Sequence, residues 1–433
     1  MVTWKNWAKN QTAHPLSIEK PRDEQAVAQV VKAAHERDEK VKVVGSGHSF
    51  TSIALTQGRL LSINNLSGIV GVDAASRRVT VHAGTTLADL NLLLDEHGLA
   101  LPNLGDITYQ TVAGAISTGT HGTGQHLTGL AGQVVGMRFI NAMGDVVETN
   151  DSTNPEILRL GRVGLGALGV LTQLTLQAVP AFHLRALEKP MRVDQVLEEI
   201  DMHVNTNDHF EFFWVPHTGW ALTKRNNRTE DAVSPQPIVR GWLDKVVIEN
   251  YGFGAVCAVG RMRPQWIPRL AKALPSSGGR EYIDKSFKVF ASTRLVKFYE
   301  MEYSIPRSHL VEALNEVRAM VNQRGYFLNF PVEVRFTKAD DMALSTSYGR
   351  DSAYIAVHIY KGMDFLPYFK DVEAIMKNHE GRPHWGKIHF RDAQDFESLY
   401  PLFGEFLQLR NRIDPARTFA NEYTEKVLDG VRV

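Results

Sequence analysis

The sequence predicts an α+β protein built from two domains, residues 1–180 and residues 181–433. Two observations carry this prediction. The first part alternates short strand patterns, helix patterns and glycine-rich turns, whereas the second alternates helix patterns with longer aromatic strands. Strands of the second kind, whose residues face inward and outward in turn, favour an antiparallel sheet backed by helices. A chain of 433 residues, 43% of them hydrophobic, can bury the cores that two such domains require.

The elements of the first part follow from local patterns. Apolar residues at helical spacing predict a helix over residues 24–37. Thr85 or Thr86 can cap a second helix over residues 87–97, which Gly98 would end. Short strands are expected at residues 41–44, 60–63 and 79–83, with a hairpin at residues 133–141 and 146–149. Residues 164–176 are expected to run from a glycine turn into a strand.

The second part shows longer elements. Helices are expected near residues 193–204, 308–324, 366–379 and 395–412. Aromatic strands are expected at residues 210–215, 332–336 and 353–360. Residues 224–238 are strongly polar and contain two prolines, which predicts an exposed loop.

Composition and charge narrow the function classes. Lysine plus arginine equals aspartate plus glutamate at 48 each, so nothing favours nucleic acid or an anionic membrane as partner. No signal-peptide pattern and no run of about 18 apolar residues is present, so we expect a soluble cytoplasmic protein. Cys257 is the single cysteine, which excludes an internal disulfide, and its apolar flanks predict a buried structural thiol. No cluster has convincing metal-ligand spacing, so we expect no metal.

Three glycine-rich stretches indicate a ligand in the first part: residues 45–49, 105–124 and 164–169. Backbone N–H groups in such turns can converge on phosphate oxygens. The first stretch fails the dinucleotide fingerprint, because Phe50 occupies the third glycine position and no clear acidic strand end follows. NAD is therefore disfavoured, and either a plain turn or another phosphate-bearing cofactor remains.

The chain resembles the vanillyl-alcohol-oxidase-type FAD flavoproteins, and within them the aldonolactone oxidase branch. The resemblance rests on motifs in the same order at residues 6–7, 41–48, 94–100, 103–105, 111–114, 119–124, 213–218, 332–337, 382–387 and 414–415. It implies the two-domain FAD-binding fold of this type. Residues 1–180 would bind FAD, and residues 181–433 would form a substrate (cap) domain whose C-terminal segment returns to the flavin.

The resemblance also implies how FAD is held. His48 matches the histidine that is bonded to the 8α-methyl group of FAD, and an accessible histidine is a suitable nucleophile. The residues expected to contact the cofactor are Val44, Gly45, Ser46, Gly47, His48, Ser49, Gly105, Thr111, Val112, Gly114, Ser117, Gly119, Thr120, His121, Gly122, Gly169, Val170 and Lys387.

The candidates for the chemistry lie mainly on the predicted strands. Glu333 and Arg335 share one strand face, where they can bracket a substrate hydroxyl, although a salt bridge without catalytic role gives the same pattern. His358 can line the same pocket or be a core histidine. By resemblance, Lys387 lies near substrate and flavin, where its charge stabilises the reduced anionic flavin. Asp106 can bind a sugar hydroxyl or cap a turn.

The expected activity is oxidation of the C2 hydroxyl of a sugar γ-lactone, such as L-gulono-1,4-lactone, by hydride transfer to flavin N5. Gly105 matches the oxidases, so dioxygen is the expected acceptor and hydrogen peroxide the product. An alditol oxidase acting on xylitol or sorbitol, a dehydrogenase with another acceptor, and a non-catalytic flavin- or sugar-binding protein remain as alternatives.

Overall fold

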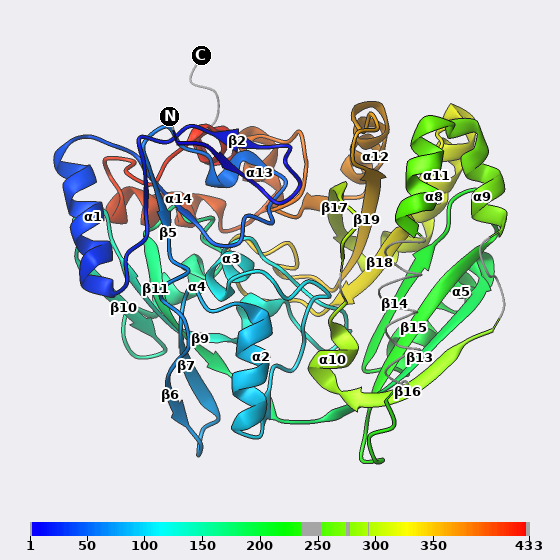
Figure 1. Ribbon diagram of the computed structural model, residues 1–433, viewed down its shortest axis with the longest axis horizontal. Helices are drawn as coiled ribbons and strands as arrows, with labels where there is room; N and C mark the ends of the chain where they lie inside the picture. Colours follow the sequence, from blue (N-terminus) through cyan, green and yellow to red (C-terminus); the bar gives the residue numbers. More distant parts are fainter. Residues whose placement is uncertain (1, 236–252, 274–277, 293, 430–433) are drawn as a thin grey trace.

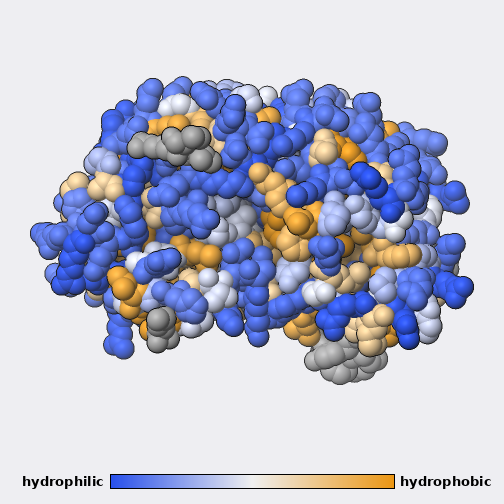
Figure 2. Space-filling view, turned by 90° about the horizontal axis from the view of Figure 1, so that it is seen from above, coloured by the Kyte–Doolittle hydropathy of each residue, from blue (hydrophilic) through white to orange (hydrophobic). Residues whose placement is uncertain are grey.

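The computed structural model describes residues 2–235, 253–273, 278–292 and 294–429. Two parts lie side by side in Figure 1, the first built around smaller sheets and the second around one large sheet. Seen from above, the surface is mainly hydrophilic, and apolar side chains gather in patches (Figure 2). No helix among the described residues is long and apolar enough to cross a membrane.

The first part contains a parallel and an antiparallel sheet. The parallel sheet has the order β3 (Ser17–Glu19), β5 (Arg59–Ser62), β4 (Val41–Val44). The antiparallel sheet has the order β10 (Val146–Asn150), β9 (Val134–Ile140), β11 (Val170–Gln177), β7 (Arg78–His82), β6 (Ile69–Asp73). Short pairs join β1 (Trp4–Lys5) to β2 (Thr12–Ala13) and β8 (Leu99–Ala100) to β12 (Val179–Pro180). The helices are α1 (Glu24–Glu36), α2 (Leu87–Glu96), α3 (Val112–Ser117) and α4 (Pro155–Gly161).

Side-chain caps fix where these helices begin. Thr86 caps α2 by accepting from the backbone N–H of Asp89, which decides between the two threonines. Thr111 caps α3 in the same way and also touches the first glycine turn. A Cβ on Gly45 would lie 2.1 Å from Thr111 Oγ1, so only glycine permits this close approach of the two loops.

The second part is an eight-stranded antiparallel sheet with helices packed against it (Figure 1). Its order is β16 (Arg280–Lys285), β13 (His183–Arg192), β15 (Trp220–Thr229), β14 (His209–Trp214), β18 (Val332–Thr337), β19 (Ser352–Tyr360), β17 (Phe298–Pro306), β20 (Arg382–Pro383). The helices of this part are α5 (Val193–Glu198), α6 (Ile200–Asn205), α8 (Phe253–Met262), α9 (Ile267–Ala273), α10 (Ser286–Phe290), α11 (Leu310–Arg324) and α12 (Leu366–Asn378).

Three expectations from the sequence were wrong in detail. The helix expected near residues 193–204 is two helices, α5 and α6, with Glu199 between them. Residues 224–229 belong to strand β15 rather than to a loop, and only residues 230–235 of that stretch are an exposed connection. Polarity in this strand does not mean exposure to solvent. Lys224, for example, reaches buried Glu211, with 3.6 Å between Nζ and Oε1. Residues 236–238 lie outside the described residues. The helix expected over residues 395–412 is two helices, because Pro401 interrupts it.

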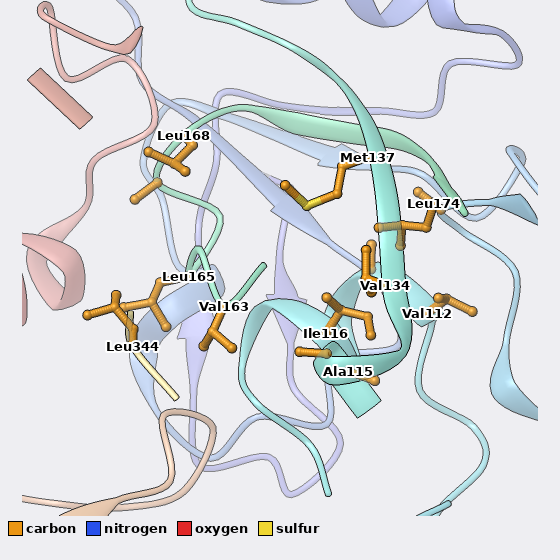
Figure 3. Close-up of a cluster of buried hydrophobic side chains, with 14 of the residues drawn as sticks. Val112, Ala115, Ile116, Val134, Met137, Val163, Leu165, Leu168, Leu174 and Leu344 are labelled. Atoms are coloured by element: carbon orange, nitrogen blue, oxygen red, sulfur yellow. The ribbon is translucent and has the colours of Figure 1, made fainter. Parts of the chain in front are cut away.

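The C-terminal segment packs against the first part. This segment contains helices α13 (Ala393–Leu399), α14 (Phe403–Ile413) and α15 (Glu422–Thr424); α14 contacts α4, and α15 contacts the turn at residues 52–54. Phe396, Phe406 and Phe419 are buried in the same hydrophobic core as α3 and β9. Figure 3 shows part of this core, in which Leu344 from the loop before β19 lies beside Leu165.

A second hydrophobic core lies between the large sheet and the helices packed on it. Cys257 is fully buried there, as expected for a structural thiol, and burial raises its pKa to about 12.

Asp414 anchors the returning segment and yields a stability prediction. It is fully buried, and its carboxylate accepts the backbone N–H groups of Thr418 (2.7 Å) and Phe419 (2.9 Å). Asp414→Ala leaves both N–H groups without an acceptor, so we expect a loss of about 2–4 kcal/mol in the free energy of unfolding. Urea denaturation measures it.

Asp392→Ala is the matched control. Asp392 also accepts two backbone N–H groups, but it is only half-buried, so water can replace it and we expect a loss of about 1 kcal/mol. Equal losses in the two variants would contradict the anchoring role of Asp414.

Candidate functional site

Two adjoining cavities lie at the glycine turns, one among the turns themselves and one between the turns and the large sheet. The first is enclosed by the three glycine-rich stretches of the first part. The second lies between these stretches and one face of strands β14, β18, β19 and β17. Both are lined by His48, Ser49, Gln110 and Thr118, so they form one continuous site.

The first cavity fits a phosphate-bearing cofactor. The turn after β4 contains Gly47 at φ +68°, a conformation that favours glycine. Among the described residues, the backbone N–H groups of residues 46–49 donate to no protein acceptor. A run of free N–H groups in such a turn is suited to anionic oxygens.

Most of the expected cofactor residues meet at this site. The first cavity is lined by Val44, Gly45, Ser46, Gly47, His48, Ser49, Thr111, Gly114, Ser117 and Gly169, and the second by Gly105, Thr120, His121 and Lys387 as well as His48 and Ser49. Val112, Gly119 and Val170 line neither. The side chains of Val112 and Val170 are buried in the hydrophobic core, where Figure 3 shows Val112. Gly122 lines a smaller neighbouring cavity.

His48 lies where the two cavities join. Its ring stacks on Trp7 with 5.5 Å between centroids, which fixes its orientation. Burial, together with the charge of Lys387, lowers the pKa of His48 to about 4. Phe50 N–H donates to Gly386 O at 2.7 Å, and this contact holds the His48 turn beside the segment that carries Lys387. Because its pKa is about 4, the His48 imidazole is neutral near pH 7, and the neutral form is the one that acts as a nucleophile.

Glu333 and Arg335 of β18 both line the second cavity, as their spacing predicted. Arg335 Nη2 lies 2.5 Å from Glu333 Oε1, and Arg335 Nε donates to Glu211 Oε2 at 2.8 Å. Among the described residues, Glu333 Oε1 has no partner in hydrogen-bond geometry. Burial raises the pKa of Glu333 to about 7; Arg335 opposes this shift, and the nearby carboxylates of Asp106 and Glu211 add to it.

Asp106 is held in ion pairs, a role that neither sequence interpretation foresaw. Its Oδ2 accepts from Arg294 Nε (3.0 Å), Arg294 Nη2 (2.8 Å) and the Ser292 hydroxyl (3.2 Å). Its Oδ1 lies 3.9 Å from Arg335 Nη2. Burial acts to raise the pKa of Asp106, but Arg294 and Arg335 hold it well below its usual range. Asp106 therefore positions the two guanidinium groups.

Lys387 and His358 meet at a third carboxylate. Glu300 of β17 pairs with Lys387 through Oε2. Its Oε1 lies 3.5 Å from His358 Nε2, while His358 Nδ1 lies 3.2 Å from Pro331 O. The register pairs Glu300 with His358, so both side chains leave the sheet on the same face.

Glu302 makes a second histidine contact on the same strand. His121 Nε2 lies 3.2 Å from Glu302 Oε1, and its ring stacks on Tyr354 with 3.6 Å between centroids. His384 also lines the cavity, and burial lowers its pKa to about 4. Its Nδ1 accepts the backbone N–H of Gly386 at 3.0 Å, which leaves Nε2 to carry the ring proton.

Sequence reasoning missed several of these residues. Glu211, Glu300 and Glu302 stand within aromatic strands, and a carboxylate inside a strand buried on both faces is a signal of the same kind as Glu333. Arg294 carries no such signal, because its partner Asp106 is 188 residues away. Among the described residues, no group of three histidine, cysteine, aspartate or glutamate side chains is placed to hold a metal ion.

Comparison with known proteins agrees with this site. Residues 15–150 match the FAD binding domain family, and residues 174–427 match the D-arabinono-1,4-lactone oxidase family. The chain is 42% identical to the L-gulono-1,4-lactone dehydrogenase of Mycobacterium tuberculosis, over 98% of this chain and 99% of that protein. It is 36% identical to the L-gulonolactone oxidase of Bos taurus, over 98% of both.

Solved structures show the same fold. A cholesterol oxidase from B. sterolicum superposes with a TM-score of 0.82 at 18% identity, covering 98% of this chain and 96% of that one. A solvent-stable cholesterol oxidase gives a TM-score of 0.81. The expected fold is confirmed, and the chain belongs to the family of FAD-dependent aldonolactone oxidases and dehydrogenases, within the vanillyl-alcohol-oxidase-type flavoproteins.

Proposed function

We propose that the protein oxidises the C2 hydroxyl of a sugar γ-lactone, with L-gulono-1,4-lactone as the first substrate to test, and passes the electrons to dioxygen. The observation that carries this proposal is the Glu333–Arg335 pair, which faces a cavity continuous with the glycine turns. Bound FAD would accept the hydride at N5 and, on reoxidation by dioxygen, release hydrogen peroxide.

In this proposal the chain's own residues handle the proton and the charges. Glu333 accepts the proton of the substrate hydroxyl, because its raised pKa suits a base near neutral pH. Arg335 stabilises the oxyanion character that develops on that oxygen. Lys387 lies in the cavity near His48 and supplies positive charge on the cofactor side. The keto-lactone released tautomerises to an ascorbate-type enediol.

We assign residues 1–180 to the FAD domain and residues 181–433 to the substrate domain. The lining of the first cavity lies entirely within residues 4–171, which supports the first assignment. The burial of α13 and α14 in the first hydrophobic core supports a C-terminal segment that returns to the flavin. His48 is the proposed attachment point of FAD.

A dehydrogenase with another acceptor is the second candidate, because the relative that is 42% identical carries that name. Gly105 favours the oxidase. It lines the second cavity, and a Cβ there would lie 3.1 Å from His121 O and 3.6 Å from Thr120 Cγ2. An added methyl group would therefore fill space beside the site.

The activity test compares lactones and polyols with two acceptors. We expect peroxide release with L-gulono-1,4-lactone in air and little with xylitol or sorbitol. Gly105→Ala should lower turnover with dioxygen by about tenfold or more, equivalent to about 1.4 kcal/mol of barrier, and affect an artificial dye acceptor less. Gly404→Ala is the control, since a Cβ there meets nothing within 4 Å. Silence with every γ-lactone would refute the function, and dye turnover without peroxide would identify the dehydrogenase.

The covalent attachment is tested by acid precipitation. Wild-type protein should retain yellow flavin in the precipitate, whereas His48→Ala should release it to the supernatant, because His48 is the only histidine among the described residues that line the first cavity. His97→Ala, at an exposed histidine, should behave as wild type. Flavin that stays bonded in His48→Ala would exclude this attachment site.

The role of Glu333 predicts a pH profile. The base must be ionised, so kcat/KM should rise about tenfold per pH unit below pH 7 and level off above it. Glu333→Gln should lower kcat by about 10²–10⁴-fold and abolish the rise of kcat/KM below pH 7, the acidic limb of the profile. In Glu211→Gln the limb should move to lower pH, because a carboxylate that raises the pKa of Glu333 is gone. A limb unchanged in Glu333→Gln would assign the titration to another group.

A further inference from the structure

Two buried carboxylates of strand β17 have no role in the proposed function. Glu300 and Glu302 are each 5% exposed and point into the second cavity from the same face of the strand. Glu302 contacts His121, whereas Glu300 contacts both Lys387 and His358. Glu300 therefore contacts two proposed site residues, whereas Glu302 contacts one.

The backbone holds Lys387 against Glu300. Ile388 N–H donates to Glu300 O at 2.9 Å, and His384 N–H donates to Glu302 O at 3.0 Å. The segment that carries Lys387 therefore runs along the main chain of β17. The main chain at Lys387 is thus held beside β17, the strand that carries Glu300. The backbone positions of both partners of the ion pair are therefore fixed relative to each other.

The surroundings make the charge of Lys387 depend on that carboxylate. Burial in a cavity disfavours an ammonium group. Burial acts to lower the pKa of Lys387, but the carboxylates of Glu300 and Glu302 more than offset it, so the pKa is raised. Among the described carboxylates, Glu300 is the one in direct contact with the ammonium group.

We propose that Glu300 is a positioning residue that keeps Lys387 charged and aimed at the flavin edge of the cavity, with His358 as its second partner. This inference rests on the proposed placement of FAD beside Lys387. It does not depend on which substrate or acceptor the enzyme uses, so it can be tested without turnover.

The test measures the affinity of the oxidised holoenzyme for sulfite, an anion whose uptake by bound flavin is favoured by positive charge near the ring. Lys387→Met should raise the dissociation constant relative to wild type at every pH. In Glu300→Gln the carboxylate in contact with the ammonium group is gone, only the more distant carboxylates of Glu302 and Asp106 still oppose burial, and the pKa of Lys387 falls. The ratio of its dissociation constant to that of wild type should therefore grow by about tenfold or more from pH 7 to pH 9. Glu300→Asp, which keeps the charge, should show a smaller rise.

Glu373→Gln is the matched control. Glu373 is also 5% exposed, but it accepts from the Tyr303 hydroxyl and the backbone N–H of Phe390, and it does not line the cavity. Its ratio should stay near one at each pH. A flat ratio in both Glu300→Gln and Glu300→Asp, with a clear effect of Lys387→Met, would overturn the role of Glu300. No effect of Lys387→Met would overturn the placement of Lys387 by the flavin and this inference with it, and lactone turnover would still report separately on the proposed activity.

Discussion

The site depends on one constraint: charged side chains buried on a sheet face must neutralise one another. Strands β14, β18 and β17 carry Glu211, Glu333, Arg335, Glu300 and Glu302 on the face toward the first part, and each is less than 10% exposed. An isolated buried charge costs several kcal/mol or more. Some of these groups pair on the sheet face itself, as Arg335 does with Glu333 and Glu211, and the remaining partners come from elsewhere in the chain.

The partners come from distant segments, which couples the site to the whole fold. Asp106 of the first part meets Arg294 and Arg335 of the second, and His121 of a glycine turn meets Glu302 of β17. Each of these contacts closes only when the two parts are packed together. The returning C-terminal segment reinforces the packing from the other side, because Lys42 of β4 donates to Phe419 O at 3.1 Å. The residues that do the chemistry are therefore ordered by the same contacts that join the two parts.

The extent to which the site could be predicted follows from the range of each interaction. Glu333 and Arg335 were predictable because i, i+2 spacing in a strand places two side chains on one face whatever the rest of the fold does. The glycine turns were predictable because their geometry is local, whereas the role expected of His48 rested on the resemblance. The ion pair of Asp106 was not, because Arg294 lies 188 residues further along the chain. The same limit explains β15: Lys224 reads as a solvated residue until Glu211 is seen beside it.

The two carboxylate clusters differ in how many negative groups compete for each cation, and this difference assigns their roles. Burial raises the pKa of Glu333 to about 7, near enough to neutrality to exchange a proton, and Arg335 offsets this shift only in part because Glu211 and Asp106 share its charge. Among the described carboxylates, Glu300 is the one in contact with Lys387, and it favours the charged form of the ammonium group. Ala356 of β19 lies opposite both Glu333 and Glu302 in the register, and its small side chain separates the two clusters. In the proposed mechanism one side of the cavity moves a proton and the other keeps one, within a single sheet face.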